Sequence, residues 1–327
     1  MQANHIYKVE KYSDSLKNIF KGVYNDFLSN AYVEYKFEIE PLAYDDFIRC
    51  VNDGLISCLV LLEDEIPTGF MVYTTEISDS LELNLIHCIG NENLNKKRCL
   101  LMEKFIELTK DIIQNRVVTY PMLGNQSQFA EEIINYGFEL TGLSVLRFSF
   151  ENPKSGNIFR NFTPIVLPDD YKIITWSQQY ADEIPKILLK SFENTTDALF
   201  DTRFTSLEGC EDILNKITTN IYGRFLPECC SILLYKEKPV GFCLANITAG
   251  TIANIPLIGI LKEHIGKGFG KELLYNTVKA IINTHLSRLS EINASTETDN
   301  YPALKMYRSI GFKEDYYYPQ AYRPIKK

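Results

Sequence analysis

A sequence segment in the first half of this chain is repeated about half a chain length later. CLVLLEDEIPTGFMVY begins at Cys58 and matches CSILLYKEKPVGFCLA, which begins at Cys230, with the turn proline and the Gly-Phe pair aligned. Two further matches follow in the same order: KRCLLMEKFIELTKDII with GKELLYNTVKAIINTHL, and Tyr-Gly-Phe at 136–138 with Ile-Gly-Phe at 310–312. Three matches in one order predict a duplicated domain.

Both repeats show the same order of predicted elements. An apolar helical pattern (residues 16–27 or 184–192) precedes a hairpin, then a strand (81–88 or 251–261), a long helix, a short strand, a second helix and a last strand. This order predicts an α+β fold with layered α/β packing: two similar domains in tandem, each a mixed, mostly antiparallel sheet flanked by helices. The stretch 151–170, rich in Pro, Asn and Gly, is the predicted linker between domains 1–150 and 171–327.

Composition supports a folded chain and limits its partners. Hydrophobic residues make up 45% of the sequence, as in a folded protein, and the length of 327 residues suits two domains. The net charge of -8 disfavours a nucleic-acid partner. The polar start of the sequence and the lack of a long apolar run predict a cytoplasmic protein with no membrane partner. Eight cysteines form no CxxC pair, and four histidines lie at no metal-ligand spacing. We therefore expect reduced thiols and no metal site.

A glycine-rich turn joins a strand to a helix in the second repeat. Gly266, Gly268 and Gly270 alternate with Lys267 and Phe269, and Lys271 follows. Such a turn points backbone N–H groups and the positive end of the helix at one place, and glycine lets an anion approach closely. The segment predicts a phosphate or pyrophosphate site, although a closely packed turn would have the same composition.

The loop and a second motif together resemble the GNAT acetyltransferase superfamily. The second motif, N-x-x-A-x-x-M-Y-x-x-x-G-F, runs from Asn300 to Phe312, about 30 residues after the loop, as in that family. The resemblance covers about 171–323. Two positions depart from it: Ile265 stands where the family has Gln or Arg, and Lys262 where it has Pro.

The resemblance implies roles for particular residues. The main chain of Ile258, Gly259 and Ile260 would bind the pantetheine arm of acetyl-CoA or another acyl-CoA, with the N–H near Ile260 polarising the thioester carbonyl. Asn300 would hold the pantetheine or cap a helix. Tyr307 would be the general acid that protonates the leaving thiolate. The implied cofactor-binding loop consists of Ile265, Gly266, Lys267, Gly268, Phe269, Gly270 and Lys271.

The sequence leaves two details of the site open. Gly259 suits either a strand bulge or close packing. Some family members use a Glu on the strand before the loop as the general base, and Pro256 stands at that position here. No general base is therefore assigned, and Glu228, Glu263 or a chain of waters remain candidates.

The implied activity is acyl-CoA-dependent transfer, most simply of acetyl from acetyl-CoA to a primary amine on a small molecule or peptide, without a metal. A non-catalytic acyl-CoA sensor and a transferase for another acyl group are the alternatives. In the first repeat Asn95 and Lys97 replace Gly268 and Gly270, and Ile133 replaces Tyr307. We therefore expect that half to be a degenerate, structural partner, so that a monomer would contain its own pseudo-dimer.

Overall fold

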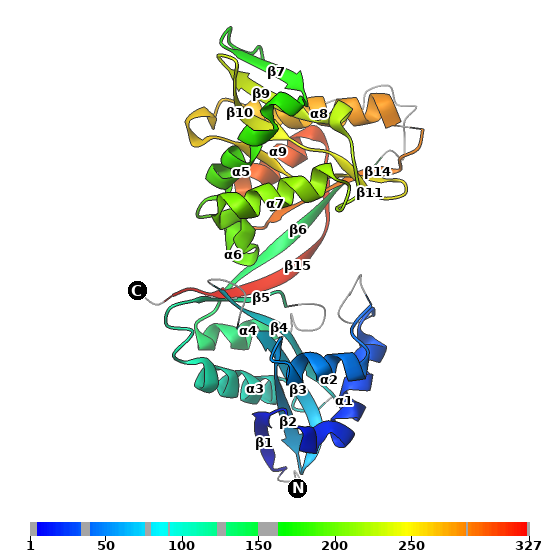
Figure 1. Ribbon diagram of the computed structural model, residues 1–327, viewed down its shortest axis with the longest axis vertical. Coiled ribbons are helices and arrows are strands. Elements are labelled where there is room, and N and C mark those ends of the chain that lie inside the picture. The colour runs from blue at the N-terminus through cyan, green and yellow to red at the C-terminus, as the bar shows by residue number, and fades with distance from the viewer. Residues whose placement is uncertain are drawn as a thin grey trace. The chain divides into compact units, whose positions relative to one another are not determined.

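The computed structural model describes residues 5–33, 40–75, 80–90, 92–122, 129–149, 163–285 and 287–325. The chain forms two compact units, and each is described by itself (Figure 1). The first unit contains 1–142 and 318–327, and the second contains 143–317. Residues 151–162 of the predicted linker lie outside the described residues, whereas 163–170 belong to the second unit.

The first unit is a mixed sheet with helices on both faces. Its strand order is β1-β2-β3-β4-β5-β15. Alternate residues of β2 face opposite sides, so Val60 and Leu62 pack with α1 and α2, while Leu59 and Leu61 pack with α3. The elements are β1 (Tyr7–Lys11), α1 (Lys17–Asn30), α2 (Tyr44–Asn52), β2 (Ser57–Glu63), β3 (Ile66–Thr74), β4 (Ser80–Cys88), α3 (Leu94–Thr109), β5 (Val117–Tyr120) and α4 (Ala130–Ile133).

The second unit contains two sheets, ordered β6-β14-β12-β11-β8 and β13-β10-β9-β7. A Cβ on Gly241 of β10 would meet Leu273 of α8, and one on Gly259 of β13 would meet Ser191 of α5, so α8 and α5 cover opposite faces. The elements are β7 (Tyr171–Thr175), α5 (Ile184–Phe192), α6 (Thr196–Phe200), α7 (Leu207–Thr218), β8 (Arg224–Phe225), β9 (Ser231–Tyr235), β10 (Lys238–Cys243), β11 (Asn246–Ala249), β12 (Ile252–Ile255), β13 (Ile258–Ile260), α8 (Phe269–His285), β14 (Glu291–Glu297) and α9 (Tyr301–Ile310).

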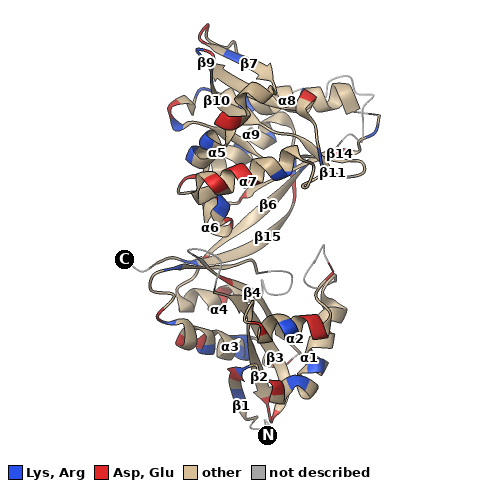
Figure 2. Cartoon of the chain, viewed as in Figure 1, with Lys and Arg blue, Asp and Glu red and all other residues tan. Residues whose placement is uncertain are grey.

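The units repeat one topological feature. Each unit contains one parallel pair among its described strands, β4 with β5 in the first unit and β12 with β14 in the second, among neighbours that are mostly antiparallel. The predicted fold class, a tandem of mixed sheets flanked by helices, is confirmed. Charged residues of both signs lie on the helices, α3 and α7 included (Figure 2). None of the described helices is long and apolar enough to cross a membrane.

The unit boundaries differ from the predicted split because the C-terminal part of the last strand of each repeat belongs to the other unit. In β6 (Glu139–Ser149), residues 143–149 pair antiparallel with β14. In β15 (Lys313–Arg323), residues 321–323 pair antiparallel with β5. A strand's sequence shows that it pairs but not with which partner, so this exchange could not be predicted from the repeat.

The strand predicted over 251–261 is interrupted. It forms β12 and β13, with Pro256 and Leu257 between them, because proline has no N–H to donate to a ladder. β12 pairs with β14, whereas β13 pairs with β10 in the other sheet. The two sheets therefore diverge at this point, and the candidate site lies beside the divergence.

Candidate active site

The free edge of β13 presents main-chain groups. β13 is the last strand of its sheet, with β10 on one side and no strand partner on the other among the described residues. The carbonyl of Leu257 accepts from Leu244 N (2.9 Å), and Leu261 N donates to the Val240 carbonyl (2.9 Å). Because groups alternate along an antiparallel ladder, the N–H and C=O of Ile258 and Ile260 point to the free edge.

Gly259 is a packing glycine. The register between β13 and β10 has no shift, and Gly259 pairs with Phe242. Gly259 therefore does not form a strand bulge. A Cβ at Gly259 would lie 3.0 Å from Ser191 Oγ and 3.1 Å from the ring of Phe242. The missing side chain lets α5 lie close to β13.

The glycine loop leads from β13 into α8. Gly266 (φ +82°) and Gly268 (φ +84°) are left-handed, a conformation that side chains disfavour. The N–H of Glu272 bonds to the Gly268 carbonyl (3.2 Å), so Gly268 opens the first turn of the helix. The first N–H groups of α8 have no acceptor within the helix, and they lie at the positive end of a 17-residue helix, which favours an anion.

A cavity of about 550 Å³ lies between this loop, β13 and α9. That volume is in the usual range for small-molecule sites. Nine of the sequence-predicted cofactor residues line it: Ile258, Gly259, Ile260, Ile265, Gly266, Gly268, Phe269, Gly270 and Lys271. The helix α9 contributes Pro302, Ala303, Lys305, Met306 and Ser309. A Cβ on Gly270 would approach Met306 Sδ to 3.1 Å, so this glycine allows the close crossing of α8 and α9.

Two predicted cofactor residues do not line the cavity. Lys267 turns to Tyr171, with Nζ 3.2 Å from the hydroxyl and 5.5 Å from the ring centroid. The Asn300 side chain accepts a hydrogen bond from Ala303 N (3.3 Å), which caps the start of α9. The helix-cap alternative for Asn300 is thus what the structure shows.

Tyr307 lies on α9 immediately after Met306, behind the cavity lining. It is 2% exposed and packs edge-on against Phe312, with ring centroids 5.3 Å apart. Burial raises the pKa of Tyr307 above its usual range, and the neighbouring Cys243 and Asp197 raise it further. The phenol is therefore protonated at neutral pH, as a proton donor must be.

Asp197 is a residue that sequence reasoning missed. It lies in the first turn of α6, a helix capped by the Thr195 side chain. Burial raises the pKa of Asp197 to about 6, and the nearby charge of Asp299 also raises it. Asp299 in turn accepts a hydrogen bond from Thr196 Oγ1 (2.7 Å). The cap pattern was visible in the sequence, but the proximity of Asp197 to Tyr307 depends on the fold.

Residues 196–312 match the family model described as Acetyltransferase (GNAT) family, a span that includes β13, the glycine loop, the cavity and Tyr307. This segment is a GNAT-family domain. Its function is therefore of the acyltransferase type. A comparison with curated protein sequences finds no significant match.

Solved structures with the GNAT fold are similar to the chain over 98% of its length. They include a GCN5-related N-acetyltransferase from Sphaerobacter thermophilus (TM-score 0.56, 11% identity, 96% of that chain). A tandem GNAT protein from the clavulanic acid biosynthesis pathway has a TM-score of 0.50 at 12% identity over 99% of its chain. A GCN5-related glucosamine N-acetyltransferase region of a fungal GH3 beta-N-acetylglucosaminidase has a TM-score of 0.54 at 11% identity, over 38% of that longer chain. At these identities the likeness shows a tandem GNAT fold.

The corresponding turn of the first GNAT-like unit is built differently. Lys97 is buried, with Nζ 2.8 Å from Glu63 Oε2 and 3.0 Å from the Ile89 carbonyl. Asn95 donates a hydrogen bond to Glu132 of α4, which ties the start of α3 to the next helix. The residues that would meet a phosphate are therefore engaged within the protein, and two of their partners, Glu63 and Glu132, are carboxylates.

Proposed function

We propose that this chain is an acyl-CoA-dependent N-acyltransferase that transfers acetyl from acetyl-CoA to a primary amine by direct attack. The observation that carries the proposal is the cavity itself, which joins the glycine loop, the free edge of β13 and α9. These are the parts that a long molecule with a pyrophosphate at one end and a thioester at the other requires.

Each part has a task in this proposal. The amides of Gly266–Gly270 and the start of α8 hold the pyrophosphate, and Lys271 adds positive charge. The pantetheine arm pairs with the outward main chain of Ile258 and Ile260. Since the Ile260 N–H points to the free edge, it donates to the thioester oxygen as negative charge develops there.

Proton transfer is assigned to two residues, Tyr307 and Asp197, and burial raises the pKa of each. Tyr307 protonates the leaving thiolate, and Asp197 accepts the proton that the acceptor ammonium must lose. Asp197 and Tyr307 come from different helices, α6 and α9, yet the charge of Asp197 acts on Tyr307 and raises the pKa of its phenol.

The pH dependence of kcat/KM tests the role of Asp197. Only the ionised carboxylate accepts a proton, so activity should fall as pH drops through about 6, the pKa of Asp197. Asp197→Asn should remove this limb and lower kcat/KM by about 10²–10⁴-fold. Asp299→Asn is the matched control: loss of a neighbouring negative charge should move the limb to lower pH with activity retained. An unchanged limb in Asp197→Asn would contradict the assignment.

The activity itself is tested by incubating the full chain with acetyl-CoA and a panel of primary amines and peptides. Release of free CoA thiol together with an N-acetylated product, found by mass spectrometry, is the expected result. Repeating the assay with longer acyl-CoA thioesters separates acetyl transfer from transfer of another acyl group. Absence of product from every pair, with binding intact, would favour the alternative of a non-catalytic sensor.

The first unit has a structural part in this proposal. In its turn Lys97 forms an ion pair with Glu63, so the anion site is missing. Ile133 stands at the position that corresponds to Tyr307, so the general acid is missing as well. A chain that contains both GNAT-like units would not need a second copy to complete a pseudo-dimer, which agrees with a monomer.

A further inference from the structure

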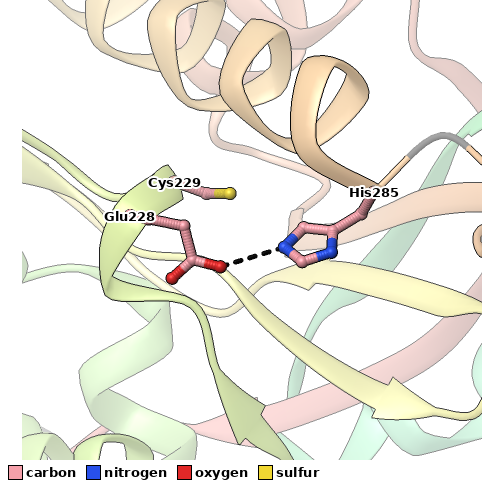
Figure 3. A group of neighbouring side chains, drawn as sticks. All are labelled: Glu228, Cys229 and His285. Atoms are coloured by element: carbon pink, nitrogen blue, oxygen red, sulfur yellow. Dashed lines mark hydrogen bonds and ion pairs between the residues drawn. The ribbon is translucent and has the colours of Figure 1, made fainter.

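Three potential metal ligands meet at the other end of α8, away from the glycine loop. Glu228 and Cys229 belong to the short 3-10 turn Pro227–Cys229 that leads into β9, and His285 is the last residue of α8. One donor atom from each lies within 4.8 Å of the other two. Figure 3 shows the Glu228 carboxylate directed at the imidazole, with Glu228 Oε1 3.0 Å from His285 Nε2.

The burial of the three residues suits a bound ion that keeps a path to solvent. Cys229 is 1% exposed and His285 8% exposed, whereas the Glu228 side chain is about half exposed. Two donors are therefore fixed in the interior, and the third lies where an ion and a water molecule can enter.

The backbone holds the donors in place. Cys229 N donates to the Leu226 carbonyl (2.9 Å), and the next residue, Cys230, is buried in the core. The Cys229 side chain has a hydrogen-bond partner in Thr284, the neighbour of His285. Ligands on such rigid elements lose little conformational entropy when they bind.

The chemistry of the donors selects the class of ion. A thiolate, an imidazole and a carboxylate are the set that Zn²⁺ accepts, usually with tetrahedral geometry and a water as fourth ligand. Magnesium and calcium prefer oxygen ligands only. Because Glu228 and His285 are far apart in the sequence, no metal-ligand spacing pattern predicts that these residues meet.

We propose that Glu228, Cys229 and His285 form a zinc-binding site, with water completing the coordination. On binding, the Cys229 thiol releases its proton to solvent, and Glu228 and His285 exchange their mutual hydrogen bond for bonds to the ion. The ion then connects the turn before β9 to the C-terminal end of α8, the helix that carries the glycine loop at its other end. The site is separate from the acyltransferase chemistry.

The test uses the full chain after treatment with a chelator, titrated with Zn²⁺ and separately with Co²⁺. Wild type should bind one equivalent, and the cobalt form should show the charge-transfer absorption of a cobalt–thiolate bond. Cys229→Ser should remove that absorption. Glu228→Ala, at an exposed position that folding does not require, should weaken zinc binding by at least about 10–100-fold. Cys50→Ser, which alters a partly buried thiol on α2, should bind as wild type does.

Circular dichroism of each metal-free variant shows whether it is folded. Folded wild type that binds neither ion would overturn the proposal. So would a thiolate–cobalt absorption that persists in Cys229→Ser, or zinc binding that Glu228→Ala leaves unchanged. If Cys229→Ser does not fold, the wild-type cobalt spectrum and Glu228→Ala decide the question between them.

Discussion

Tyr307→Phe should lower kcat by about 10²–10⁴-fold while acetyl-CoA binding stays unchanged. The phenol is buried on α9 directly after the cavity-lining Met306, and its raised pKa keeps it protonated. Removing the hydroxyl forces the thiolate to leave without a proton, a contribution of about 3–5 kcal/mol to the barrier. Steady-state kinetics with saturating acetyl-CoA measure the effect.

The control for this variant is a second phenol in the same unit. Tyr180→Phe alters a partly buried tyrosine that packs against the same core outside the proposed site, so it should keep wild-type turnover. Full turnover in Tyr307→Phe would contradict the role of Tyr307 as general acid. A chain with no turnover in either form, but with equal affinity for acetyl-CoA, would be a sensor.

Gly268→Glu should abolish the stabilisation of the chain by acetyl-CoA. Wild type at 100 times Kd should gain about 2.7 kcal/mol in the free energy of unfolding, measured by urea titration. A side chain at Gly268 is strained at φ +84° and would lie 3.4 Å from Ile165, and a carboxylate there repels the pyrophosphate. The backbone strain alone should cost about 1–2 kcal/mol of stability.

Gly54→Glu separates strain from binding. Gly54 has a similar φ of +76° and is exposed, and a Cβ added to it would meet no atom within 4 Å, so the substitution carries the same backbone cost in the first unit. This variant should retain the full ligand-induced gain. Equal stabilisation of Gly268→Glu and Gly54→Glu would mean that acetyl-CoA binds elsewhere.

The sequence predicted the parts of the fold that local patterns specify. The repeat implied two similar units, and the glycines at 266 and 268 marked a turn that needs positive φ. The cavity then brought most of the predicted loop residues together with β13, because a strand, a tight turn and a helix in succession leave few alternative arrangements.

Other features depend on pairings that the sequence does not encode locally. The exchange of strand ends between the units, the placement of Asp197 near Tyr307 and the meeting of Glu228 with His285 each join distant segments. Lys267 shows the same limit on a smaller scale. Its position in the loop predicted an anion contact, but the side chain lies over Tyr171, an interaction that only tertiary packing could reveal.

Calorimetric titration of the full chain with acetyl-CoA measures whether only the second unit contains a working acyl-CoA site. We predict one equivalent of acetyl-CoA per chain in wild type and none in Gly268→Glu. Two equivalents per chain would contradict the structural role of the first unit. No binding of acetyl-CoA or any longer acyl-CoA would contradict the proposed acyltransferase.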